Sequence, residues 1–149
     1  MVRAVAQRAR SGAVTIAGRE VARIGRGLVV LVGIGEGDDE RAVEKVADKV
    51  AVMRVFEDEE GKMNRSAADV GGAMLVVSQF TLYGDLRKGR RPSFIGAAAP
   101  ERGKALYQYF AARLASHGYE VQCGEFGADM LVALENEGPV TIILDSDAL

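Results

Sequence analysis

The chain has 149 residues, 48% hydrophobic and 27% charged, which favours one domain (residues 1–149) with a substantial core. Its single cysteine excludes an internal disulfide framework, and one cysteine with one histidine nearly excludes a Cys/His zinc site. The net charge of −2 argues against indiscriminate nucleic-acid binding, and the absence of a signal-peptide pattern or a long apolar run predicts a cytoplasmic protein with no membrane segment.

The first third of the chain has the pattern of short antiparallel strands. Its β-favouring runs are Val2–Gln7, Ala13–Ile16, Val21–Ile24 and Leu28–Ile34. Turn residues separate these runs, at Ser11-Gly12, Gly18 and Gly25-Arg26-Gly27. The hairpin-like spacing predicts antiparallel pairing.

Two main helices are predicted further along. The first opens at the acidic residues Asp38–Glu40 and ends near Arg54, with Val43, Val46, Val50 and Met53 on one face. The second opens at Pro100 and is followed by Gly118, with a buried stripe of Leu106, Tyr109, Phe110 and Leu114. Further strands are predicted at Val55-Phe56, Met74–Val77, Val121–Cys123, Met130–Leu134 and Val140–Leu144. This order predicts an α/β domain with a mixed sheet.

Several residues of types that are common in functional sites are better explained by a structural role. Gly33–Gly37 lacks the spacing of a phosphate-binding loop and is interpreted as a strand-to-helix turn. His117 precedes Gly118 at a helix end, where a capping role is favoured over catalysis. Cys123 lies in a strand pattern and is interpreted as a packed apolar residue.

The segment Ser78-Gln79-Phe80-Thr81 breaks the apolar run of the strand before it. It is either a strand end with satisfied hydroxyls or a site. As a site it offers hydroxyls, an amide and backbone N–H groups, which can bind a carbonyl and stabilise a developing oxyanion.

A second segment, Gly138-Pro139, lies just before the strand Val140–Leu144. It is either a simple turn or a rigid backbone clamp. A cis X-Pro bond can turn two successive carbonyls to one side, and glycine permits close approach of another molecule.

A compact basic run, Arg87-Lys88-Gly89-Arg90-Arg91, follows the first segment. Such a run is commonly a solvated loop. Its place beside a candidate site also suits contact with a phosphate backbone.

Taken together, these segments resemble the D-aminoacyl-tRNA deacylase family. The resemblance runs in the same order from end to end and is carried by Gln7-Arg8, Ala13–Thr15, Phe56–Asn64, Asp69–Gly72, Val76–Tyr83, Arg87–Phe94, Phe126–Met130 and Gly138–Thr141. Small departures are Glu137, where Asp is more usual, and Ala133, where Ser is common.

The resemblance implies a cytoplasmic homodimeric hydrolase with a three-layer α/β fold and mixed, largely antiparallel sheets. We expect no cofactor and assign no metal ligands, and whether a metal assists is left open by the sequence. Its substrates would be D-aminoacyl-tRNA and glycine mischarged on alanine tRNA. By the resemblance, Ser78, Gln79, Phe80 and Thr81 line the pocket at the ester, and Met130 lies on the adenine side. The Gly138-Pro139 pair would enter the partner's pocket, held in orientation by Arg8.

The resemblance leaves the chemistry open between two mechanisms. Thr81 could be a nucleophile, or backbone N–H groups near Phe80 and Thr81 could polarise the ester while the ribose 2′-hydroxyl assists. We favour the second, because an aminoacyl ester is already reactive and no histidine base is expected nearby. A tRNA-binding module without catalysis and a general small-ester hydrolase are the alternative classes.

Overall fold

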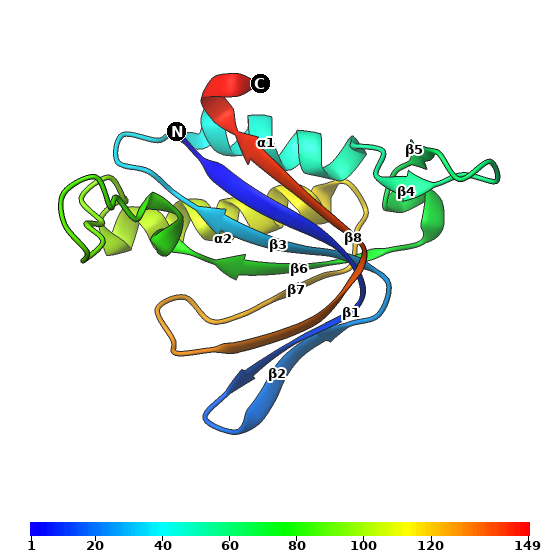
Figure 1. The fold of residues 1–149 in the computed structure, drawn as a ribbon, viewed down its shortest axis with the longest axis horizontal. Coiled ribbons are helices and arrows are strands. Elements are labelled where there is room, and N and C mark those ends of the chain that lie inside the picture. Colours follow the sequence, from blue (N-terminus) through cyan, green and yellow to red (C-terminus); the bar gives the residue numbers. More distant parts are fainter.

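The computed structural model describes all 149 residues, and its main feature is a strongly bent six-stranded mixed sheet (Figure 1). The strand order is β2-β1-β3-β6-β7, and β8 pairs with the other edge of β1 along its length. The strands are β1 (Arg3–Ile16), β2 (Arg19–Ile24), β3 (Gly27–Gly33), β6 (Ala73–Ser78), β7 (Val121–Cys123) and β8 (Leu131–Asp145). β1 pairs antiparallel with β2, β3 and β8, whereas the β3–β6 and β6–β7 pairs are parallel.

The remaining elements are two α-helices, a small sheet and three short 3₁₀ helices. They are α1 (Glu40–Val52), α2 (Pro100–Ser116), β4 (Phe56–Glu57), β5 (Met63–Arg65), η1 (Ala68–Val70), η2 (Phe80–Tyr83) and η3 (Ser146–Ala148). Asp39 caps α1 by accepting a hydrogen bond from the Ala42 N–H at 3.0 Å. Pro100 opens α2, and Gly118 follows its C-cap with a φ of 95°. Neither helix is both long and apolar enough to cross a membrane.

Two cores divide the molecule into layers. The larger core lies between the two helices and the sheet face that they cover, and it includes Val30, Val46 and Phe110. The smaller core lies inside the bend of the sheet, where β1 and β2 curl over β3 and β6, and it includes Val14 and Leu75 (Figure 1). The predicted α/β class, with a mixed sheet and two main helices, is confirmed.

The antiparallel pairing predicted for the first third is also confirmed. Two segments that were predicted to interrupt strands, one in the first third and one near the end of the chain, lie within continuous strands instead. Ser11-Gly12 is no turn, because β1 continues through it. A Cβ on Gly12 would lie 2.8 Å from Val29 Cγ2, so glycine here permits close packing inside the bend. Gly138-Pro139 likewise lies within β8, which joins the two strands predicted on either side.

The second helix also differs slightly from the prediction. Leu106, Phe110 and Leu114 are buried as expected, but Tyr107 rather than Tyr109 completes the stripe. Tyr109 is half-buried, and its hydroxyl donates to the Glu44 carboxylate on α1. Since helix faces repeat at three and four residues, positions 107 and 110 share the buried face.

Candidate functional site

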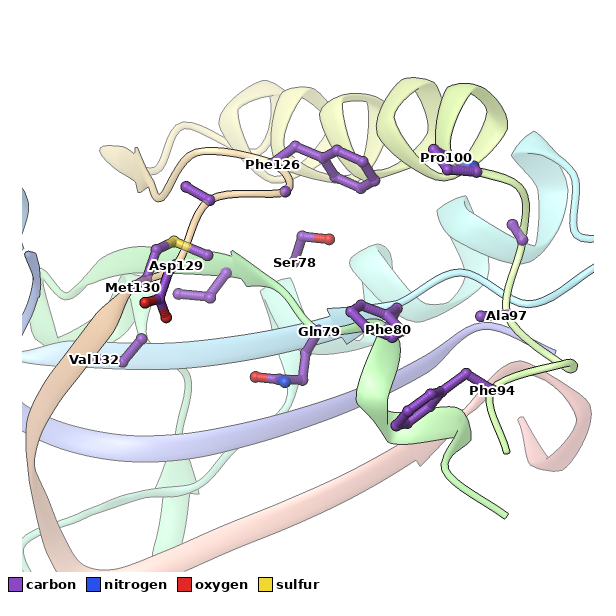
Figure 2. Close-up of a pocket in the computed structure, with 14 residues that line it drawn as sticks. Ser78, Gln79, Phe80, Phe94, Ala97, Pro100, Phe126, Asp129, Met130 and Val132 are labelled. Atoms are coloured by element: carbon purple, nitrogen blue, oxygen red, sulfur yellow. The ribbon is translucent and has the colours of Figure 1, made fainter. Parts of the chain in front are cut away.

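A cavity of about 590 Å³ opens where β6 ends (Figure 2). Its wall combines the end of β6, the start of η2, the segment before α2 and the loop between β7 and β8. It is lined by Val77, Ser78, Gln79, Phe80, Phe94, Ala97, Ala98, Pro100, Phe126, Gly127, Ala128, Asp129, Met130 and Val132. Nine of these 14 residues are hydrophobic, so the cavity suits a largely apolar ligand with a few polar groups.

The predicted segment reaches the cavity because β6 leaves the sheet at its end. Ala73–Val77 are buried, whereas Ser78 and Gln79 are half-buried. The Gln79 N–H still donates to the Val32 carbonyl at 2.8 Å, and the chain then turns into η2. No side chain caps η2, and the first N–H groups of a helical turn have no partner within it. Backbone donors are therefore concentrated at Phe80 and Thr81.

Tyr83 fixes the far end of η2. Its hydroxyl donates to the Gly33 carbonyl at 2.9 Å and also contacts the Met1 carbonyl. Burial raises the pKa of the Tyr83 phenol well above its usual range, so the hydroxyl remains a neutral donor. The turn that carries Phe80 and Thr81 is thus anchored to the end of β3.

Aromatic rings form one rim of the cavity. Phe80 and Phe94 meet edge to face with ring centroids 5.0 Å apart, and Figure 2 shows them together at the cavity edge. Phe80 is 55% exposed, so part of its surface is available to a ligand. Thr81 is exposed and does not line the cavity; its hydroxyl accepts a hydrogen bond from Gln79 Nε2.

Met130 lies on the opposite side of the cavity from these rings (Figure 2). A Cβ on Gly124 would come within 2.6 Å of Met130 Sδ, so the glycine makes space for this side chain. Phe126 packs against Tyr107 of α2 with centroids 6.0 Å apart. These contacts fix the loop that closes the cavity.

The cavity contains few ionisable groups. Asp129 is the only charged residue in its lining. His117 instead caps α2 and pairs with Asp48 at 2.8 Å, as the predicted capping role requires. Nowhere in the chain do three or more His, Cys, Asp or Glu side chains gather as a metal site. Gly33–Gly37 forms the turn between β3 and α1, and Cys123 is half-buried in β7, so both structural interpretations are confirmed.

The second predicted segment forms an exposed backbone feature. The Gly138-Pro139 peptide bond is cis, and both residues are exposed. Gly138 has a φ of 121°, which L-residues with side chains rarely adopt. It lies where the pairing register between β1 and β8 shifts.

Arg8 supports this feature from beneath. Its side chain is only 6% exposed, and it donates to the Glu137 carbonyl at 3.2 Å and the Val55 carbonyl at 2.8 Å. A Cβ on Gly138 would lie 2.9 Å from Arg8 Nη2. Arg8 thus links the backbone just before Gly138 to the segment between α1 and β4.

Within one chain, the two predicted segments are not brought together. Gly138 and Pro139 do not line the cavity, whereas Met130 and Val132, near the start of β8, do. From Val132 to Gly138 an extended strand covers about 20 Å, at roughly 3.3 Å per residue. Sequence reasoning also missed Phe94, Pro100 and Phe126 as lining residues. An aromatic within a polar, glycine-rich loop was the available signal for Phe94.

Comparison with known proteins places this fold and cavity in a family. The family model described as D-Tyr-tRNA(Tyr) deacylase matches residues 5–145. The chain belongs to this family. It is 56% identical to the D-aminoacyl-tRNA deacylase of Brevibacillus brevis, across 97% of this chain and 100% of that protein. It is also 56% identical to the Thermus aquaticus D-aminoacyl-tRNA deacylase, across 97% of this chain and 95% of that one.

Two solved structures share the fold of this chain. The c-Myc DNA Unwinding Element Binding Protein superposes with a TM-score of 0.90 at 39% identity, covering 96% of this chain and 97% of its own. A probable eukaryotic D-amino acid tRNA deacylase superposes with a TM-score of 0.85 at 21% identity, covering 97% and 98%, which shows a shared fold. The predicted resemblance to the deacylase family is confirmed. The roles of individual site residues remain predictions.

Proposed function

We propose that the protein hydrolyses the ester between a D-amino acid and the 3′ end of tRNA, releasing free D-amino acid and tRNA. The observation that carries this proposal is the largely apolar cavity at Ser78–Phe80, in a chain that matches curated D-aminoacyl-tRNA deacylases over nearly its whole length. Phe80 and Met130 offer apolar surfaces for the terminal adenosine. The backbone at the start of η2 offers donors for the ester carbonyl.

In the proposed mechanism, the enzyme supplies electrostatic stabilisation and position rather than a strong base. The N–H groups of Phe80 and Thr81 polarise the ester carbonyl and stabilise the oxyanion that forms when water attacks. The ribose 2′-hydroxyl assists the attack by taking a proton from the water and passing its own proton to the departing 3′ oxygen, so that the products are the free D-amino acid and tRNA with an intact 3′-hydroxyl. The absence of histidine and lysine from the cavity lining supports this division of roles. Thr81 is the weaker candidate nucleophile, because its hydroxyl lies outside the lining.

We infer that selectivity for D-residues comes from the partner chain of a homodimer. The Gly138-Pro139 pair is exposed and lies outside its own cavity, so it is available to another chain. Its two carbonyls would hold the α-amino group and face the hydrogen of a D-residue. An L side chain would collide with backbone that cannot retreat, because Arg8 lies beneath it.

This exclusion extends the substrate range to glycine. Glycine has no side chain to collide with the clamp, so glycine mischarged on alanine tRNA would also be a substrate. Selection by a penalty on one enantiomer also explains why many D side chains could be accepted.

Deacylation of D-tyrosyl-tRNA and L-tyrosyl-tRNA by the purified protein tests the proposal. We expect the D-ester to be cleaved at least 100-fold faster, about 2.8 kcal/mol of discrimination at 1.4 kcal/mol per factor of ten. Equal rates would overturn the chiral mechanism, and no cleavage at high enzyme concentration would leave only a tRNA-binding module. Cleavage of a simple ester such as p-nitrophenyl acetate without tRNA, together with equal rates on the D- and L-tyrosyl esters, would favour a general esterase.

A further inference from the structure

A basic loop, residues 85–93, projects from the rim of the cavity. Backbone hydrogen bonds close its base: the Asp85 N–H donates to the Ser93 carbonyl at 2.8 Å, and the Ser93 N–H donates to the Asp85 carbonyl at 2.9 Å. These two hydrogen bonds hold the two ends of the loop together at its base. The residues between them, 86–92, form the tip of the loop. The loop contains the basic run Arg87–Arg91, and the proposed chemistry does not use it.

The base of the loop is attached to the cavity wall. Phe94, which follows the closing pair, lines the cavity and packs on Phe80 (Figure 2). On the other side, a Cβ on Gly84 would lie 3.3 Å from Phe94 and 3.6 Å from Pro92. The base of the loop therefore lies beside the rim that Phe80 forms.

The tip carries positive charge that nothing in the chain neutralises. Arg87 pairs with Asp85 at 2.7 Å, and this guanidinium holds the pKa of Asp85 at about 2. Lys88, Arg90 and Arg91 are exposed and make no hydrogen bond or ion pair with other side chains. No other stretch of four residues holds three such cations, although the whole chain has a net charge of −2. The charge is thus a local feature.

A second concavity borders the base of the loop. This groove of about 720 Å³ is lined by Arg3, Asp85 and Arg87 beside apolar residues that include Leu86 and Ile95. Leu86 is 60% exposed and Ile95 is 83% exposed. Cations beside exposed apolar side chains suit a polymer of phosphates, sugars and bases.

We propose that the loop 85–93 binds the phosphodiester backbone of the tRNA acceptor end next to the terminal adenosine. This inference rests on the proposed function, because the strand must leave the cavity past its rim once the aminoacyl-adenosine is bound inside. Lys88, Arg90 and Arg91 contact the phosphates, and Arg87 keeps the loop in shape through Asp85. An RNA strand is favoured over an acidic protein or a membrane because these cations border the substrate cavity itself.

The test is the triple variant Lys88→Gln, Arg90→Gln, Arg91→Gln, which alters exposed side chains that hold no structural contact. Binding of uncharged tRNA and KM for D-tyrosyl-tRNA are measured from 50 to 200 mM salt. At 50 mM salt, we expect the Kd for uncharged tRNA and the KM for D-tyrosyl-tRNA each to rise at least tenfold. The slope of log K against log salt should fall by about 2, at roughly 0.7 per phosphate contact to a single strand. Binding of a small analogue, 3′-(D-tyrosyl)amino-3′-deoxyadenosine, should not change.

A control variant of equal charge change is Arg19→Gln, Arg41→Gln, Lys49→Gln, whose three exposed side chains belong to β2 and α1 rather than to the loop. Its salt slope should match that of the unaltered protein. Equal slopes for both triple variants, or loss of analogue binding in the loop variant, would overturn the inference. So would binding of polyglutamate or anionic vesicles as tightly as tRNA. If tRNA binds through the loop but no ester is cleaved, the proposed function fails and the inference stands.

Discussion

At the scale of single residues, backbone groups are more important to the candidate site than reactive side chains. The cavity lining contains Ser78 and Gln79 but no histidine, lysine or cysteine. The exposed Gly138-Pro139 pair offers only carbonyls, and the buried Arg8 touches the carbonyl just before it. A search for catalytic side chains would therefore overlook most of the proposed machinery.

Thr81 is the residue at which the two mechanisms differ. In the variant Thr81→Ala, we expect kcat for D-tyrosyl-tRNA to fall less than about tenfold, because each factor of ten equals ~1.4 kcal/mol and only the contact to Gln79 is lost. Single-turnover deacylation measures this, and a thermal melt confirms that the variant is folded. A loss of several orders of magnitude in a folded variant would identify the hydroxyl as the nucleophile.

At the scale of elements, the two helices are joined by a charged cluster on their outer side. Asp48 of α1 accepts bonds from Arg113 at 2.8 and 2.9 Å and also contacts His117 at 2.8 Å. These partners, Arg113 foremost, lower the pKa of the Asp48 carboxyl to about 2. The cluster lies far from the cavity lining, so its effect is on stability.

The cluster predicts a pH-dependent contribution to folding. Because the folded state lowers the pKa of Asp48, its carboxylate stabilises the fold above the ordinary carboxyl value of about 4. This stabilisation is lost as pH falls from about 4 to about 2. The difference in free energy of unfolding between the unaltered protein and Asp48→Asn, measured in urea, should shrink as the pH falls below 4. A difference that stays the same at pH 3 would contradict this.

At the scale of the whole molecule, we propose that two chains together complete the site. The cavity and the Gly138-Pro139 pair lie apart on one chain, as the length of β8 between them requires. In a two-fold symmetric pair, each chain could give its clamp to the other's cavity. The proposed activity is then a property of the assembly.

Mixing two inactive variants tests this arrangement. Ala97→Trp fills the cavity, and Gly138→Val places a side chain 2.9 Å from Arg8 Nη2 at a φ that disfavours it. A mixed dimer has one intact cavity facing one intact clamp. After random re-pairing of equal amounts, we expect roughly one quarter of the unaltered D-tyrosyl-tRNA deacylation, since half the dimers are mixed and each has one working site. No recovery from folded dimeric variants would contradict a shared site.

The sequence alone was sufficient for whatever depends on local pattern or on long family motifs. Helix starts at Asp39 and Pro100, the antiparallel first third and the α/β class follow from caps, turns and apolar spacing. The deacylase family followed from the motifs around Ser78 and Gly138. Because these patterns involve residues close together in the chain, they can be recognised without knowing the tertiary structure.

Only the tertiary structure decided how distant segments meet. Gly12 resembles a turn residue in the sequence, but the bend of the sheet brings Val29 against it, so β1 continues. Phe94, Pro100 and Phe126 become cavity residues because the ends of β6, β7 and α2 converge. The separation of Gly138 from the cavity also depends on the pairing of β8 with β1. Long-range packing has no local pattern, and this is why the sequence identified both halves of the proposed site but not their distance.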